Sequence, residues 1–211
     1  MSHPSGTTAA RGDEYLQRAY ALAGSSEAQS LQQLKGYASP RRCVETVINN
    51  ISSTQMSSDK LKILDAGCGT GLVGDCLAQS SLAGKFVLDG VDLSDGMLAV
   101  ARKKGMCREL ETANLNERIE KPDGTYAVVV CVGTLTKGHV GPKVLVEFAR
   151  LTVKSGLVVV RVHDDVWESG GFKAEIERLR DVGTVEIVST AEFGIIEETS
   201  AGGRMVVLRK I

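Results

Sequence analysis

Runs of purely apolar residues alternate with helical patterns over most of this 211-residue chain. The clearest runs are Ala127–Val130 and Leu157–Val160, in which every residue is apolar. A strand without polar residues on either face is buried on both sides, as in a parallel sheet that is covered by helices. The alternation therefore predicts an α/β fold with a doubly wound, Rossmann-like sheet of mainly parallel strands.

The expected elements follow one another as strand and helix from residue 60 to residue 182. The predicted strands are Leu61–Asp65, Phe86–Leu93, Arg108–Ala113, Tyr126–Gly133 and Leu157–His163. The predicted helices are Gly71–Ser80, Asp95–Lys104, Gly141–Thr152 and Gly171–Val182. Near the C-terminus, two further strands are expected at Thr184–Phe193 and Arg204–Ile211. Because their connection is short, these two must pair antiparallel, which completes a seven-stranded sheet.

Two helices are predicted before the first strand. Apolar residues recur at helical spacing over residues 15–23, and Pro40 begins a second helix. We expect residues 1–55 to form a helical cap segment and residues 56–211 to form the α/β domain, together as one structural unit. A chain of this length with 43% hydrophobic residues can bury a single sizeable core.

The charge balance and the cysteines exclude several classes of function. The chain has 25 Lys and Arg against 26 Asp and Glu and a pI near 6.3, so no nucleic-acid partner is expected. No stretch approaches the roughly 20 apolar residues of a membrane span, and residues 1–11 lack the apolar core of a signal peptide. We therefore expect a cytoplasmic protein without membrane contact. The five cysteines lack paired CxxC spacing, so we expect reduced thiols and no metal site.

The segment Asp65–Gly71, with the sequence DAGCGTG, joins the first predicted strand to the helix that follows it. In an open α/β sheet, ligands bind at the carboxyl ends of the strands where the strand order reverses. Gly67, Gly69 and Gly71 allow the backbone to turn sharply and to approach a ligand without a Cβ in the way. This segment therefore predicts a cofactor site.

Two cofactors fit these glycines. Residues 69–74 satisfy the GxGxxG pattern of dinucleotide sites, and Asp92 ends the second strand at a suitable distance to hold a ribose. A dinucleotide site, however, begins its glycines directly after the strand, and a carboxylate at Asp65 would repel a pyrophosphate. S-adenosylmethionine carries an ammonium and a sulfonium, which an acid at the strand end attracts by about 1 kcal/mol if partly solvated. We therefore favour S-adenosylmethionine over NAD.

Asp92 is suited to bind an adenosine ribose whether the cofactor is S-adenosylmethionine or NAD, because a carboxylate can accept hydrogen bonds from both ribose hydroxyls. The alternative is that Asp92 is only the N-cap of the helix after the second strand. Ser94 and Asp95 are better placed for that role.

With this loop, Asp92 and the antiparallel ending, residues 60–211 resemble the class I S-adenosylmethionine-dependent methyltransferases. Within that family the chain is similar to the methyltransferase-like protein 27 type. The motifs that carry the likeness are Leu64–Gly71, Val91–Ser94, Gly133–Val140 and Val166–Glu168.

The resemblance implies a cofactor site whose parts follow the cofactor from its amino-acid end to its adenine. Its expected members are Asp65, Gly67, Cys68, Gly69 and Gly71 at the amino-acid end, Asp92, Leu93 and Met97 at the ribose and adenine, Asn114 and Leu115 at the adenine, and Cys131 below the transferred methyl. Asn114 stands where the family commonly has an acid, but its carbonyl can still accept from an exocyclic amine. A methionine on a helix face, such as Met97, is as often part of the core.

Four residues are candidates for the acceptor side. His139 follows the fourth predicted parallel strand and is the candidate base, although a structural role in the 138–142 turn fits it equally. Thr134, His163 and Trp167 are candidate substrate contacts. The alternative for His163 is a bond to Asp164 and nearby backbone, and the alternative for Trp167 is to anchor the next helix.

One segment departs from the family pattern. Relatives carry a Trp-Ala and a Tyr-Asp element between the N-terminal helices, which closes over the cofactor, whereas Gln29–Tyr37 runs past it. A shortened lid would reduce turnover, because methyl transfer benefits from excluded water and fixed geometry. We expect a methyltransferase that acts on a small molecule by direct transfer. The alternatives are a catalytically weakened cofactor-binding or interaction module and an NAD-dependent oxidoreductase.

Overall fold

The computed structural model describes residues 37–52, 60–192 and 202–211. Its helices are α2 (Ser39–Asn50), α3 (Leu72–Ala78), α4 (Asp95–Lys104), α5 (Val144–Leu151), α6 (Asp164–Trp167) and α7 (Phe172–Asp181). Its strands are β1 (Leu61–Ala66), β2 (Phe86–Asp92), β3 (Cys107–Thr112), β4 (Tyr126–Leu135), β5 (Thr152–His163), β6 (Val185–Glu192) and β7 (Gly203–Lys210). The helix predicted over residues 15–23 and the proposed lid segment before Tyr37 lie outside the described residues.

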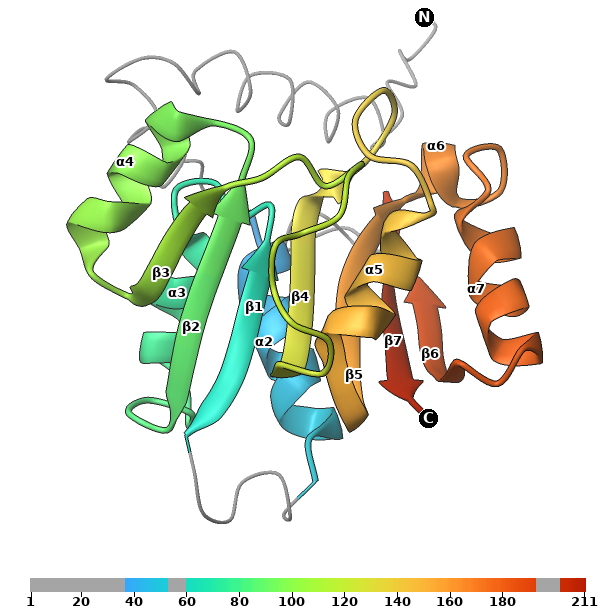
Figure 1. Ribbon diagram of the computed structural model, residues 1–211, viewed down its shortest axis with the longest axis horizontal. Helices are drawn as coiled ribbons and strands as arrows, with labels where there is room; N and C mark the ends of the chain where they lie inside the picture. The colour runs from blue at the N-terminus through green and yellow to red at the C-terminus, as the bar shows by residue number, and fades with distance from the viewer. Residues whose placement is uncertain (1–36, 53–59, 193–201) are drawn as a thin grey trace, which may run out of the picture.

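The strands form one sheet in the order β3-β2-β1-β4-β5-β7-β6 (Figure 1). β1 pairs parallel with β2 on one side and with β4 on the other, and β5 pairs parallel with β4. β7 pairs antiparallel with both β5 and β6. The predicted seven-stranded sheet with an antiparallel end is thus confirmed. Because the chain runs outward from β1 to β3 and then returns to β4, the strand order reverses beside β1, where α/β sheets bind ligands.

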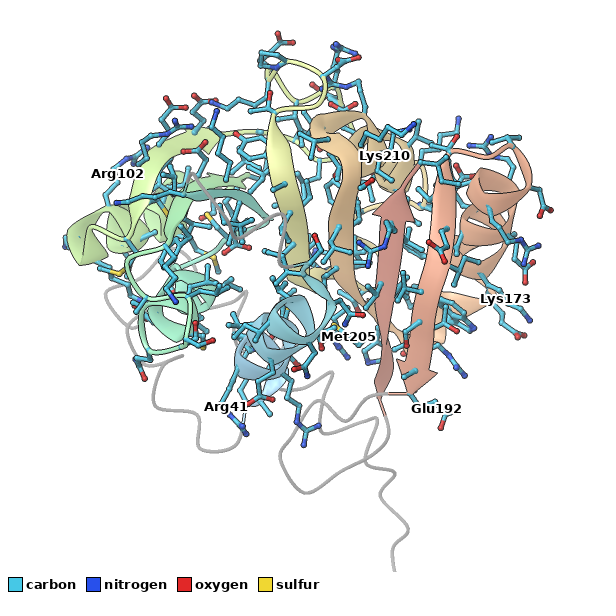
Figure 2. The ribbon with its side chains drawn as sticks, turned by 90° about the horizontal axis from the view of Figure 1, so that it is seen from below. Arg41, Arg102, Lys173, Glu192, Met205 and Lys210 are labelled. Atoms are coloured by element: carbon cyan, nitrogen blue, oxygen red, sulfur yellow. The ribbon has the colours of Figure 1, made fainter. Side chains whose placement is uncertain are left out.

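Helices cover both faces of the sheet and bury two hydrophobic clusters. On one face, α2 and α3 pack Val44, Val47 and Leu77 against the strands. On the other face, α5 and α7 pack residues such as Phe148 and Phe172 against β4 and β5. The outer surfaces of the helices carry charged side chains, among which Arg41, Arg102 and Lys173 are labelled in Figure 2. Both faces of the central strands are therefore buried, as their apolar runs predict.

The largest differences from the predictions are the start of β5 and the presence of α6. β5 begins at Thr152 rather than Leu157, because the chain leaves α5 directly into a strand and Thr152 pairs with Tyr126. The short helix α6, which the sequence patterns did not predict, begins where the His163 side chain accepts a hydrogen bond from the Asp165 N–H. Among the described residues, no helix is long and apolar enough to cross a membrane.

Within the described range 60–192, residues 113–125 connect β3 to β4 without a helix and cross one face of the sheet (Figure 1). Ion pairs anchor this crossover, since the Lys121 ammonium lies 2.8 Å from the Glu109 carboxylate and 2.7 Å from that of Glu111. Arg150 of α5 donates to the carbonyls of Ile119 and Lys121. The crossover therefore holds residues 113–116 at the carboxyl end of the sheet.

A buried polar group ties the strands on either side of β1 together. Asp89 of β2 is 1% exposed, and its carboxylate accepts hydrogen bonds from the Tyr126 hydroxyl of β4 and from Arg108 Nε of β3, both at 3.0 Å. Burial and the Asp89 carboxylate raise the pKa of Tyr126, so the hydroxyl remains a donor at neutral pH.

We expect Tyr126→Phe to lower the free energy of unfolding by about 1.5–3 kcal/mol, the usual contribution of a hydrogen bond to a charged group. Thr46→Val is the control, because the Thr46 hydroxyl donates only to the Arg42 carbonyl in its own helix. Urea unfolding measures both. An equal, small loss in the two variants would contradict a role for Tyr126 in joining the strands.

Candidate functional site

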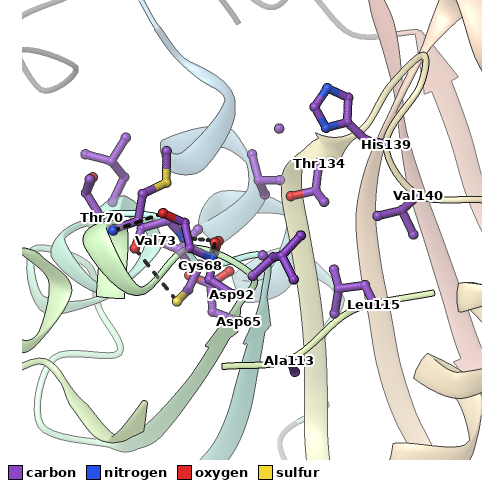
Figure 3. Close-up of a pocket in the computed structure, with 18 of the residues that line it drawn as sticks. Asp65, Cys68, Thr70, Val73, Asp92, Ala113, Leu115, Thr134, His139 and Val140 are labelled. Atoms are coloured by element: carbon purple, nitrogen blue, oxygen red, sulfur yellow. Dashed lines mark hydrogen bonds between the residues drawn. The ribbon is translucent and has the colours of Figure 1, made fainter. Parts of the chain in front are cut away.

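A cavity of about 620 Å³ opens at the carboxyl ends of β1, β2 and β4. Its wall comes from the loops after β1, β2, β3 and β4 and from the start of α2, so segments far apart in the sequence meet there (Figure 3). This is the position at which the reversal of strand order predicts a ligand. Most of its lining is apolar or glycine, with a few polar groups aimed inward.

The glycine loop after β1 is fixed by backbone hydrogen bonds. The N–H groups of Gly67 and Cys68 both donate to the Val91 carbonyl of β2, at 2.8 and 3.0 Å. Gly67 has a φ of +76°, and a Cβ at this position would lie 2.2 Å from Thr134 Oγ1 at the end of β4. Only glycine allows the loop to approach β4 so closely in this conformation.

Asp92, at the end of β2, is held by two backbone donors. One carboxylate oxygen accepts the Gly69 N–H at 2.8 Å and the other accepts the Ser94 N–H at 2.9 Å. The N-cap of α4 is Ser94, whose side chain accepts from the Met97 N–H. The alternative that Asp92 is merely a helix cap is therefore wrong. Its carboxylate is orientated beside the cavity, with lone pairs left for a ligand's hydroxyls.

Asp65 lies at the floor of the cavity and is 1% exposed (Figure 3). Within the described residues, its Oδ2 atom has no hydrogen-bond partner. Burial, and then the nearby Asp92 carboxylate, raises the pKa of Asp65 to about 8. A buried, unsatisfied carboxyl group is costly to the free protein, and a cationic ligand group would satisfy it.

Apolar side chains form the end of the cavity beyond Asp92. Leu115 and Met97 are each 6% exposed there, whereas Leu93 is 70% exposed at the rim. Asn114 also lines the cavity, but its amide is engaged locally: its oxygen accepts the Asn116 N–H and its nitrogen donates to Glu117. This end therefore suits a flat apolar group more than a strongly polar one.

The opposite end lies next to the loop after β4. Thr134 and Val140 border it, and the exposed His139 stands at its edge (Figure 3). Sequence reasoning did not assign Tyr37, Pro40 or Asn116 to the site, although all three line the cavity. Tyr37 and Pro40 reach the cavity from an element distant in the sequence, and Asn116, although next to the predicted Leu115, carries no motif of its own.

The structure brings together eleven of the residues proposed from the sequence. Those that line the cavity are Asp65, Gly67, Cys68, Gly69, Asp92, Leu93, Met97, Asn114, Leu115, Thr134 and His139. Gly71 does not line it, because its Cα faces α4, where an added Cβ would lie 3.5 Å from that of Ala101. Cys131 is fully buried in the cluster on the α5 and α7 face, and its neighbours Val132 and Gly133 line the cavity instead.

The substrate contacts expected at His163 and Trp167 are also wrong. His163 is 0% exposed, and its Nδ1 accepts the Asp165 N–H at 3.2 Å at the start of α6. Trp167 is 9% exposed, and the Arg204 guanidinium lies 5.1 Å from the centre of its ring. Both residues therefore stabilise the junction between β5, α6 and β7 rather than the cavity.

Comparison with known proteins shows what this arrangement is similar to. Residues 63–156 match the family described as methyltransferase domain. Methyltransferase-like protein 27 from Homo sapiens is 31% identical over 154 residues, which cover 71% of this chain and 60% of that protein. The chain thus spans about three fifths of the length of that relative.

Solved structures agree in fold. A TehB-like SAM-dependent methyltransferase from Corynebacterium glutamicum aligns over 96% of this chain and 99% of its own, with a TM-score of 0.60 at 20% identity. The [4+2]-cyclase SpnF aligns over 81% of this chain and 80% of its own, with a TM-score of 0.57 at 16% identity. At such identities the likeness establishes the fold, and the second example shows that the fold alone does not fix the chemistry.

Two glycines with nearly the same φ allow the close approach of Gly67 to be tested. Gly84 has a φ of +74°, but an added Cβ there would meet nothing within 4 Å. We expect Gly84→Ala to cost about 1–2 kcal/mol of unfolding free energy from backbone strain alone. Gly67→Ala should cost at least about 1 kcal/mol more, because the new methyl group overlaps Thr134. Equal losses in denaturant unfolding would contradict the close approach.

The raised pKa of Asp65 predicts a pH dependence of stability. The unfolded carboxyl titrates near pH 4, so between about pH 4 and 8 the folded protein binds the extra proton and stability falls as pH rises. In Asp65→Asn this loss of stability with rising pH is absent, because an asparagine side chain does not titrate. We therefore expect the unfolding free energy of the variant, relative to the natural protein, to rise by up to about 4 kcal/mol between pH 5 and 8.5. A difference that does not change with pH would contradict a protonated Asp65.

Proposed function

We propose that this chain is a class I S-adenosylmethionine-dependent methyltransferase and that it transfers a methyl group to a small-molecule acceptor. The observation that carries the proposal is the unsatisfied Asp65 carboxyl group, buried at the floor of the cavity beside a glycine loop. When bound, S-adenosylmethionine supplies a methyl group made electrophilic by its sulfonium. The protein must then hold the cofactor, align the acceptor and exclude water.

The cavity fits this cofactor from end to end. Asp65 would receive the ammonium group, because a buried acceptor without a donor favours a cation. Asp92 would accept from the ribose hydroxyls, since its two backbone bonds already fix its orientation. Leu93, Met97 and Leu115 would enclose the adenine between apolar surfaces.

The acceptor would lie at the end bordered by Tyr37, Thr134 and His139. Within the described residues, the cavity wall contains no Lys or Arg, so it offers no charge to attract a phosphate group. This supports a small neutral or cationic acceptor rather than a nucleic acid. His139 is the side chain best placed to take a proton from a hydroxyl, amine or thiol, provided the acceptor needs a base.

Two alternatives fit less well. An NAD-dependent oxidoreductase would place a pyrophosphate near Asp65, where an acid repels it, and Gly71 of the GxGxxG pattern faces α4 instead of the cavity. A catalytically weakened binding module keeps the cofactor site but lacks turnover. It is favoured only by the short segment before Tyr37 in the sequence.

Calorimetry with S-adenosylhomocysteine, which keeps the ammonium group, tests the cofactor assignment. Asp65→Asn should weaken its binding by about 10- to 100-fold, because a charge-assisted hydrogen bond is lost. Asp75→Asn is the matched control, since Asp75 pairs with Lys104 outside the cavity wall. Absence of binding to the natural protein, or equal affinities in the two variants, would refute the assignment.

Turnover separates the methyltransferase from the binding module. The natural protein, incubated with S-adenosylmethionine and pools of small phenols, amines and thiols, should release S-adenosylhomocysteine in the presence of an acceptor. Binding without any such release across these pools would favour the weakened module.

A further inference from the structure

Asn116 joins two neighbouring loops that both contribute to the cavity wall. Its side-chain nitrogen donates to the His139 carbonyl at 3.2 Å, and its side-chain oxygen accepts the Gly141 N–H at 3.1 Å. The amide thus binds the loop after β4 at two backbone positions. A single-point contact would allow that loop to pivot, whereas two bonds from one planar group fix its direction.

Asn116 is itself held within a small turn after β3. Its N–H donates to Asn114 Oδ1 at 3.0 Å, and Asn114 Nδ2 donates to Glu117 Oε1 at 2.9 Å. Leu115, between the two asparagines, is 6% exposed and lines the cavity. Leu115, an apolar residue that this turn contributes to the cavity, is therefore the direct neighbour of the residue that bonds to the other loop.

The two loops meet at the cavity wall. Leu115 lies beside Val140 of the loop after β4, and His139 lies farther along that loop, near Thr134 (Figure 3). A ligand that settles against Leu115 restrains the 114–117 turn, and through the Asn116 amide it restrains the backbone of His139. Since these bonds lie at an exposed site, their contribution is to geometry more than to global stability.

We propose that Asn116 is a positioning residue, which couples occupation of the cofactor end at Leu115 to the placement of His139 on the acceptor side. The proposal rests on the proposed function, in which the cofactor occupies the Leu115 end. It predicts that the cofactor binds first and organises the acceptor site, because the acceptor-side loop takes its direction from the turn that the cofactor contacts.

Histidine NMR on the full chain with S-adenosylhomocysteine tests this coupling. The chain has three histidines, and His139→Gln identifies the ring signals of His139. In the natural protein, saturating S-adenosylhomocysteine should shift those signals and slow hydrogen exchange at the Gly141 amide. In Asn116→Ala, at a ligand concentration that again saturates the protein, the effect of S-adenosylhomocysteine on the His139 signals should fall by at least half.

Two further variants make the test specific. Asn116→Asp keeps the acceptor for Gly141 but loses the donor to His139, so it should show an intermediate effect. Glu117→Ala changes the same turn without touching the loop after β4, so it should respond to the ligand as the natural protein does.

The outcomes separate the two proposals. If S-adenosylhomocysteine binds and Asn116→Ala keeps the full response of His139, the coupling is refuted while the cofactor assignment stands. The coupling is also refuted, without the use of any variant, if the ligand binds the natural protein but changes neither the His139 ring signals nor the exchange rate of the Gly141 amide. If the ligand does not bind the natural protein, the proposed function fails, and the coupling fails with it.

Discussion

The burial of the Asp65 carboxyl group beneath the glycine loop is the constraint on which the site depends. Asp65 is an internal residue of the sheet, between β2 and β4, and 1% of its surface is exposed. A strand residue in this position is normally apolar, because a buried carboxyl group without a donor destabilises the folded protein. In this protein the carboxyl group lies at the cavity floor, where a cationic ligand group can replace the hydrogen bonds with water that burial removes. The unfavourable burial of this carboxyl group is thus located where ligand binding can compensate for it.

The neighbouring elements are arranged around this group by ordinary packing. Gly67 approaches Thr134 too closely for any side chain, which brings the loop after β1 against the end of β4. Asp92 bonds to the backbone of the same loop through Gly69 and so fixes its other side. Because the glycine loop is held from both directions, this part of the cavity is shaped before a ligand arrives, and binding does not have to order the loop.

The fold and the cofactor end of the site were predictable from the sequence, because their signals are local. Apolar runs such as Leu157–Val160 specify buried strands, and the spacing of Asp65, Gly67 and Asp92 specifies what stands at the strand ends. Cys131 lies outside the cavity because side chains alternate along β4: Cys131 packs with Val129 into the cluster beneath α5, while the next residue, Val132, lines the cavity. Nor could His163 be recognised as the cap of α6, a helix without a periodic pattern. Tyr37 and Asn116 reach the cavity through long-range contacts, which no spacing in the sequence encodes.

Proton release on cofactor binding tests the central role of Asp65 most directly. Since its pKa in the free protein is raised to about 8, Asp65 is mostly protonated at pH 7 and must ionise to pair with an ammonium group. Calorimetry of S-adenosylmethionine binding in buffers of different ionisation enthalpy counts the protons. We expect release of about one proton per bound cofactor at pH 7 in the natural protein and none in Asp65→Asn. Binding without proton release, or the same release in both proteins, would contradict the role assigned to Asp65.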